Sequence, residues 1–107
     1  MNRDHIFKEI KACLANVLND RATAILFGSQ ARGDYRPDSD WDLLIILHNR
    51  GSIGYEEIGR LSLPLYSLAA ELDVEINPVI INLDDWEKRN FHPLYQNIKA
   101  EGVRIWG

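Results

Sequence analysis

The sequence is poor in three features that would point to particular classes of protein. Its single cysteine, Cys13, excludes an internal disulfide and lies in an apolar helical pattern that predicts a small core residue. The longest apolar run, residues 43–47, is far too short to span a bilayer. Sixteen acidic against twelve basic residues give a net charge of -4, which argues against a general nucleic-acid clamp. Together with an N-terminus too charged for a signal peptide, these absences favour a cytoplasmic protein without a membrane span.

The length and the hydrophobic content predict one globular domain over residues 1–107. With 46% hydrophobic and 26% charged residues, the composition is neither disordered nor low in complexity. A chain of 107 residues leaves no room for two domains, and a domain of this size buries enough surface to form a core.

Hydrophobic periodicity predicts helices that alternate with strands. Helices are expected over 4–19, 55–72 and 93–101, a helical turn over 84–88, and strands over 22–27, 41–47 and 74–81. The apolar strand 41–47 is expected at the centre of the sheet. Pro64 is expected to kink or split its helix, and Pro78 implies a bulge or an edge position. The pattern indicates an α+β (α/β-like) fold with a small mixed sheet covered by helices.

Two carboxylates begin the central strand. Asp40 and Asp42 are two residues apart, so in a strand they project from the same face. Like charges this close repel unless a cation lies between them, and magnesium takes one or two carboxylates together with water and phosphates. An isolated pair of this kind is more often a solvated strand end.

Gly28 and Ser29 follow the first strand. A glycine there lets the backbone approach a ligand closely, and a helical turn starting at Ser29 would offer free N–H groups to phosphate. The alternative is that Ser29 only caps a turn. Taken together with the carboxylate pair, the two segments suggest nucleotidyl transfer, because a metal must connect the carboxylates to the phosphates being cleaved.

The stretch FGSQARGDYRPDSDWDLL resembles the signature of the minimal nucleotidyltransferases (MNT) of the DNA polymerase β-like superfamily. That signature is Gly-Ser, about ten residues, then Asp-x-Asp, and it is matched by Gly28, Ser29, Asp40 and Asp42. The resemblance implies the nucleotidyltransferase fold. It also implies transfer of a nucleoside monophosphate, AMP from ATP, with two Mg²⁺ ions held by the carboxylates.

The family usually has a third carboxylate on a later strand, and here Glu75 and Asp73 are the candidates. Glu75 is favoured because its apolar neighbours point to the opposite face, whereas Asp73 is placed to end the preceding helix. Glutamate departs from the commoner aspartate. Catalytic and metal-binding roles are therefore expected for Asp40, Asp42 and Glu75. Nucleotide binding is expected at Gly28, Ser29 and Arg32, although Arg32 could instead pair with a nearby aspartate.

The resemblance also implies a partner. Small members of this family are typically paired with a HEPN-domain protein, often a toxin, and some attach AMP to one of its tyrosines as antitoxins. A chain this short has little room for its own acceptor pocket, so the expected contact is the aromatic segment 86–106. The rival interpretation is a non-catalytic module of the same fold that neutralises its partner by contact.

Overall fold

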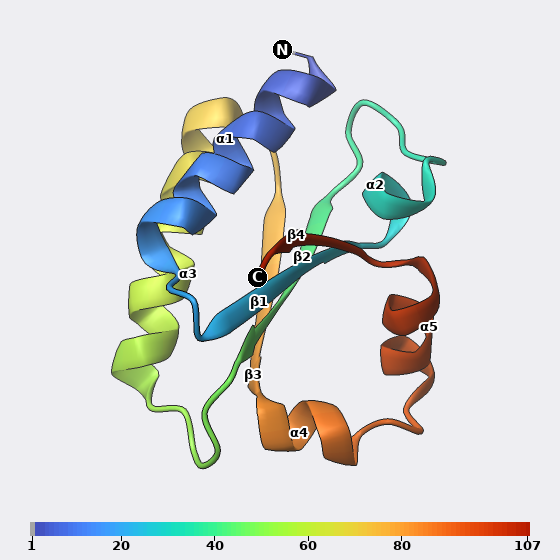
Figure 1. The fold of residues 1–107 in the computed structure, drawn as a ribbon. Helices are drawn as coiled ribbons and strands as arrows, with labels where there is room; N and C mark the ends of the chain where they lie inside the picture. Colours follow the sequence, from blue (N-terminus) through green and yellow to red (C-terminus); the bar gives the residue numbers. More distant parts are fainter. Residues whose placement is uncertain (1) are drawn as a thin grey trace.

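Residues 2–107, which the computed structural model describes, form five helices and four strands (Figure 1). In chain order they are α1 (Arg3–Val17), β1 (Ala22–Phe27), α2 (Ser29–Arg32), β2 (Trp41–Leu47), α3 (Tyr55–Leu72), β3 (Ile76–Asn82), α4 (Leu83–Lys88), α5 (Pro93–Glu101) and β4 (Val103–Trp106). None of the helices in this part of the chain is both long and apolar enough to cross a bilayer.

The four strands form one mixed sheet in the order β3-β2-β1-β4. β1 is antiparallel to β2 and to β4, whereas β2 and β3 are parallel. The predicted α+β class and the central position of β2 are confirmed. Pro78 lies on the edge strand β3, where one side of the strand has no partner and a missing N–H is tolerated. The β2–β3 register has no bulge, so the edge position is the alternative that holds.

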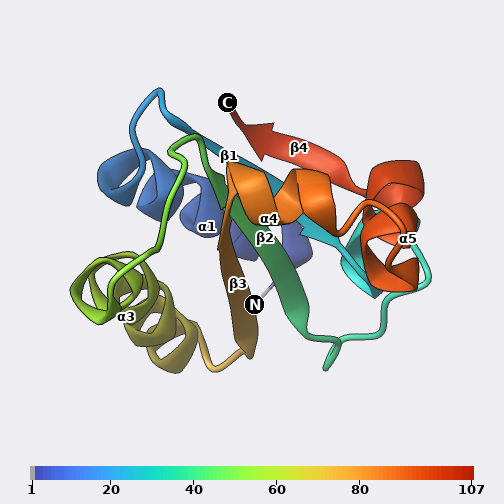
Figure 2. The same cartoon turned by 90° about the horizontal axis from the view of Figure 1, so that it is seen from below.

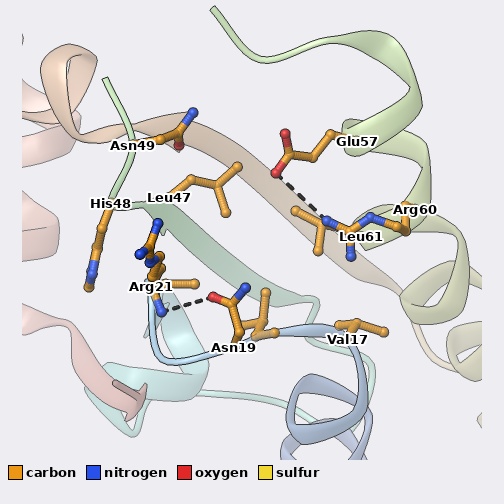
Figure 3. Close-up of a pocket in the computed structure, with 11 residues that line it drawn as sticks. Val17, Asn19, Arg21, Leu47, His48, Asn49, Glu57, Arg60 and Leu61 are labelled. Carbon is orange, nitrogen blue, oxygen red and sulfur yellow. Dashed lines mark hydrogen bonds and ion pairs between the residues drawn. The ribbon is translucent and has the colours of Figure 1, made fainter. Parts of the chain in front are cut away.

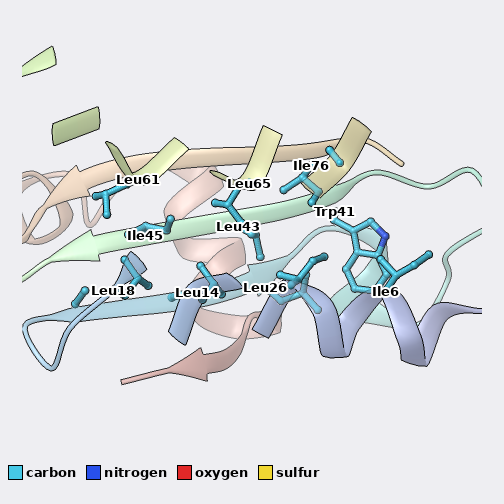
Figure 4. Close-up of a cluster of buried hydrophobic side chains, with 14 of the residues drawn as sticks. Ile6, Leu14, Leu18, Leu26, Trp41, Leu43, Ile45, Leu61, Leu65 and Ile76 are labelled. Atoms are coloured by element: carbon cyan, nitrogen blue, oxygen red, sulfur yellow. The ribbon is translucent and has the colours of Figure 1, made fainter. Parts of the chain in front are cut away.

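The helices cover the sheet unequally. α1 and α3 pack side by side on one face, and α4 and α5 lie on the other (Figures 1 and 2). Alternate residues of β2 supply both layers: Leu43 and Ile45 face α1 and α3, as Figure 4 shows, and Leu44 and Ile46 face α5. Burial of each such side chain contributes about 1.5–3 kcal/mol to folding. Cys13 is half-buried at the edge of the first layer, and burial raises the pKa of its thiol.

Two features of the fold differ from the sequence prediction. Of the kink or split expected at Pro64, the split does not occur: α3 continues through Pro64 as one helix, because Leu61 and Leu65 on either side of it are buried and hold both turns against the sheet. The chain also ends in a fourth strand, β4, which the sequence analysis did not predict. β4 is only four residues long and half exposed, so its apolar pattern was too short to indicate a strand.

Candidate active site

Gly28 connects β1 to the short helix α2 in a conformation that favours glycine. Its φ is 74° and its ψ is -159°, and it occupies the N-cap position of α2. A Cβ atom added to Gly28 would lie 2.4 Å from Oδ2 of Asp42. The backbone at Gly28 therefore lies directly against the carboxylate pair, and the two halves of the predicted signature meet in space.

Asp40 and Asp42 lie at the start of β2, at the end of the sheet where β1 finishes. Asp42 pairs with Phe27 of β1 on one side and with Asn77 of β3 on the other. Trp41, between the two aspartates, points the other way and is buried among the side chains of the α1 side. The two aspartates therefore share the face that carries α5, as their spacing predicts.

Asn77 is a site residue that the sequence analysis missed. Its Nδ2 donates to Oδ2 of Asp40 at 3.2 Å and to Oδ1 of Asp42 at 3.3 Å. One amide group thus lies between two like charges and lowers their repulsion. The available signal was its position two residues after Glu75, because alternate residues of an extended segment share a face. Glu75 itself directly precedes β3, which begins at Ile76 and not at residue 74 as predicted.

The structure brings Glu75, and not Asp73, to the aspartate pair. Trp41 N–H donates to the Glu75 carbonyl at 2.9 Å, which aligns Glu75 with Asp40 at the start of the parallel ladder. A hydrogen bond with Asp40 and its negative charge raise the pKa of the Glu75 carboxyl. Asp73 instead caps the C-terminus of α3 with a φ of 53°, as predicted for a residue that ends the helix.

The donor set at this end of the sheet fits magnesium in its chemistry. Magnesium binds through one or two carboxylates and keeps several waters, so it does not need a complete protein cage. In residues 2–107, no group of three or more Asp, Glu, His or Cys side chains is arranged to hold a metal ion, so only the Asp40–Asp42 pair is offered to magnesium as the side chains stand. The Asn77 amide shows that the space between Asp40 and Asp42 accepts an electropositive group.

Arg32 lies at the end of α2 and has two carboxylate partners. Its Nε lies 3.3 Å from Asp34 Oδ1, and its Nη1 lies 3.6 Å from Oε2 of Glu101 on α5. The ion pair with Asp34 is one that the sequence anticipated, whereas Glu101 was missed. Both pairs are exposed and contribute little to stability, so the guanidinium remains available to an anion.

A cavity of about 160 Å³ adjoins this guanidinium. Gly28 and Arg32 form one side of it, and Leu94 and Asn97 of α5 form the other. A second pocket lies at the opposite end of the β1–β2 pair, where Arg21, His48 and Arg60 line it (Figure 3). That pocket contains none of the predicted site residues, whereas Gly28 and Arg32 both line the first cavity.

The family model described as "Polymerase beta, Nucleotidyltransferase" matches residues 8–106. The chain belongs to this nucleotidyltransferase family. The match includes both halves of the signature and Glu75, and it confirms the resemblance inferred from the sequence.

Two relatives in this nucleotidyltransferase family come from Methanocaldococcus jannaschii. The inferred protein adenylyltransferase MJ0141 is 37% identical over 76 residues, which are 70% of this chain and 75% of the relative. The inferred protein adenylyltransferase MJ0604 is 30% identical over 103 residues, which are 95% of this chain and 96% of the relative.

Solved structures share the nucleotidyltransferase fold. A toxin–antitoxin crystallised with AMP-PNP gives a TM-score of 0.64 at 21% identity, and the match covers 94% of this chain and 72% of that one. A mutant of the MntA-HpeT toxin–antitoxin, with two aspartates two positions apart changed to glutamate, gives a TM-score of 0.59 at 19% identity. That match covers all of this chain and 74% of the other.

Glu75 is expected to make the stability of the metal-free nucleotidyltransferase depend on pH. Its folded pKa is raised above the ordinary value of 4.5, so the folded state binds a proton more tightly than the unfolded state. The stabilisation is present below pH 4.5 and is lost as the pH rises through the folded pKa. Melting temperatures measured in EDTA should therefore fall over this range in the parent, and the fall should be smaller in Glu75→Gln.

Asp73→Asn is the control for this prediction, because Asp73 lies two residues away and caps a helix. Its melting profile should keep the pH dependence of the parent. If Asp73→Asn flattens the profile and Glu75→Gln does not, the assignment of the third carboxylate is wrong.

Proposed function

We propose that this protein transfers AMP from ATP, with divalent metal, to a hydroxyl group of a partner protein, namely a tyrosine of a HEPN-type toxin. The observation that carries the proposal is the convergence of Asp40, Asp42 and Glu75 beside the backbone of Gly28. Carboxylates and a tight glycine turn at one sheet end are what a metal-assisted phosphoryl-group transfer requires.

Asp40 and Asp42 would hold two Mg²⁺ ions, with Glu75 as the third ligand. When bound, such ions neutralise charge on the attacking and leaving oxygens of the transfer. The protein's contribution is to keep two repelling carboxylates convergent, and the shared hydrogen bonds of Asn77 support that role. Glutamate at position 75, where aspartate is commoner, gives a longer side chain at an exposed residue just before the edge strand β3.

Gly28, Ser29 and Arg32 would bind the phosphates of ATP. The first amides of α2 have no partner within the helix, so they can donate to phosphate oxygens. Arg32 lines the cavity beside Gly28 together with its partner Glu101, and it would exchange its weak surface ion pairs for an anionic ligand there.

Glu75 would also accept the proton of the attacking hydroxyl. The hydroxyl oxygen attacks the α-phosphorus, the bond to the β-phosphate oxygen breaks, and pyrophosphate leaves with the electron pair. Glu75 lies beside Asp40, so its carboxylate would be at the metal site where the attacking hydroxyl has to lose its proton. The same residue thus serves the acceptor side of the site.

The partner is proposed from the relatives and from the surface. Two relatives are named for protein adenylylation, and the structural neighbours are toxin–antitoxin proteins. Within the predicted contact segment 86–106, Trp86 packs on Tyr95 and Trp106 donates to a backbone carbonyl. Phe91 is 85% exposed, and it, the nearby Leu94 and Val103 of β4 are exposed apolar side chains that can contact a partner.

The test is the intact mass of a HEPN-type partner after incubation with this protein, ATP and Mg²⁺. We expect the partner to gain one or a few AMP units, and the gain should be absent when the acceptor tyrosine is replaced by phenylalanine. Stable binding without a mass change would instead support the contact-only module. Neither binding nor a mass change would remove the antitoxin role.

A further inference from the structure

Gln30 is a buried polar residue that the proposed chemistry does not use. It follows Ser29 in α2, and its side chain is only 5% exposed. Its Oε1 accepts from Arg3 Nε at 2.9 Å, and its Nε2 donates to the Ser39 carbonyl at 3.2 Å. One amide side chain thus connects the residue after Ser29 to the residue before Asp40.

Arg3 holds Gln30 from the start of α1. Besides the bond to the side chain, its Nη2 donates to the Gln30 carbonyl at 2.8 Å, so the guanidinium grips both the side chain and the backbone of this residue. Among residues 2–107, Arg3 makes no ion pair with a carboxylate. Its guanidinium therefore interacts with the side chain and carbonyl of Gln30 and with the neighbouring aromatic rings.

Aromatic rings fix the position of this guanidinium. Its central carbon lies 4.5 Å from the centroid of Tyr35 and 5.3 Å from that of Trp41. Trp41 separates the two site aspartates in sequence and is buried on the opposite face of the sheet. Phe7 of α1 stacks on Trp41 at 5.9 Å, which adds a second contact between α1 and the start of β2.

The segment between the two halves of the site needs such a connection. Residues 32–38 are all exposed and contain no helix or strand beyond Arg32. α2 has only four residues, so its own hydrogen bonds cannot fix its position on the sheet. Without contacts that hold α2 to the rest of the protein, Ser29 could move relative to Asp40 even though β1 and β2 stay paired.

We infer that Arg3 and Gln30 act together as a clamp that sets the position of the phosphate-binding helix α2 relative to the aspartate pair. They are positioning residues, because they act through Ser29 and Asp40. Arg3 connects α1 to α2 through its hydrogen bonds to Gln30, and Gln30 connects α2 to the residue before Asp40 through its hydrogen bond to the Ser39 carbonyl. The expected effect on activity rests on the proposed nucleotidyl transfer. The expected effect on the mobility of α2 and of residues 39–42 does not.

The test compares Arg3→Met, Gln30→Ala and the double variant with the parent protein. We expect each single change to lower kcat for AMP transfer about 10- to 100-fold and to raise the KM for ATP, because small misplacements of reacting groups are costly. The double variant should be no worse than the poorer single variant, since the two residues act as one unit. Arg3→Lys keeps the charge but not the forked donors, so it should recover only part of the loss.

Arg21→Met is the matched control. Arg21 is an exposed arginine at the other end of the sheet, and its side chain makes no hydrogen bond or ion pair within residues 2–107 (Figure 3). It should leave kcat and KM unchanged. A purely structural role for Arg3 and Gln30 would lower the melting temperature but leave kcat per folded molecule unchanged, and that result would overturn the clamp.

Hydrogen exchange separates failure of the clamp from failure of the proposed function. In Arg3→Met and Gln30→Ala, backbone amides of residues 29–32 and 39–42 should exchange several-fold faster, while those of α3 keep the parent rate. This readout needs no ATP and no acceptor. If the parent transfers no AMP but these amides loosen, the clamp stands and the proposed function falls; unchanged exchange in both variants would overturn the clamp.

Discussion

Replacing Asp42 by asparagine is expected to reduce AMP transfer by about 10³-fold, which corresponds to about 4 kcal/mol of transition-state stabilisation. Asp42 is the aspartate nearest to Gly28, so it connects the carboxylate pair with the phosphate-binding turn. Its loss removes one of two charges that hold the divalent metal, and asparagine has the same size and still fits beside Phe27 and Asn77 in the ladder. Initial rates with saturating ATP and Mg²⁺ measure the effect.

The same variant should respond differently from the parent to magnesium. Without metal, Asp42→Asn should melt at the parent's temperature or above it, because one of two neighbouring like charges is gone. Added Mg²⁺ should raise the melting temperature of the parent, since a ligand that binds only the folded state stabilises it. The variant should show little of this increase.

Asp38→Asn is the matched control for the loss of Asp42. Asp38 is exposed, lies two residues before Asp40 and makes no ion pair in residues 2–107. Asp38→Asn removes the same charge from the loop just before β2, so it should retain transfer within about twofold. Equal activity of Asp42→Asn and the parent would falsify the catalytic proposal and leave the contact-only module.

Gly28→Ala is expected to lower both activity and stability. Its φ of 74° is unfavourable for alanine, and the new Cβ would lie 2.4 Å from Oδ2 of Asp42. The backbone strain should cost about 1–3 kcal/mol of unfolding free energy. Because the carboxylate must move to relieve the clash, AMP transfer should fall by about 10²-fold. Chemical denaturation and initial rates measure the two effects separately.

Substitutions at two other glycines separate the effect of backbone strain from the effect of displacing the Asp42 carboxylate. Gly33 has a φ of 90° but no atom within 4 Å of an added Cβ, so Gly33→Ala should lose stability and keep most of its activity. Gly54 is the N-cap of α3, with a φ of -79° and open space around it, so Gly54→Ala should keep its activity and lose only the stability difference between two N-cap residues. If Gly33→Ala loses as much activity as Gly28→Ala, the close approach of Gly28 to Asp42 is not what matters.

Long periodic segments of this chain could be predicted from the sequence, because their own side chains decide them. The apolar strand β2 and the helix α3 both lie where the pattern places them. Pro64 shows the limit of such local rules. Its missing N–H weakens one turn of α3, yet the buried Leu61 and Leu65 outweigh that loss, and their burial depends on the sheet below.

The strand β4 shows the same limit in the opposite direction: it forms although its local sequence does not predict a strand. Its four residues carry no clear alternation, and they form a strand because β1 offers an unpaired edge beside them. A prediction from local pattern cannot include an edge that other parts of the chain create.

For the candidate site, the sequence by itself determined the glycine turn and the aspartate pair on one face, and it predicted a third acid at position 75 or 73. Their spacing within single segments was sufficient, because a strand's alternation fixes which side chains share a face. Only the tertiary structure decided which groups from different segments meet. The parallel β2–β3 register places Asn77 between the aspartates, and the packing of α1 on the sheet brings Arg3 to Gln30. Residues 27 to 37 positions apart met in these contacts because strand pairing and core burial hold whole elements in place, and no local pattern records where an element will be placed.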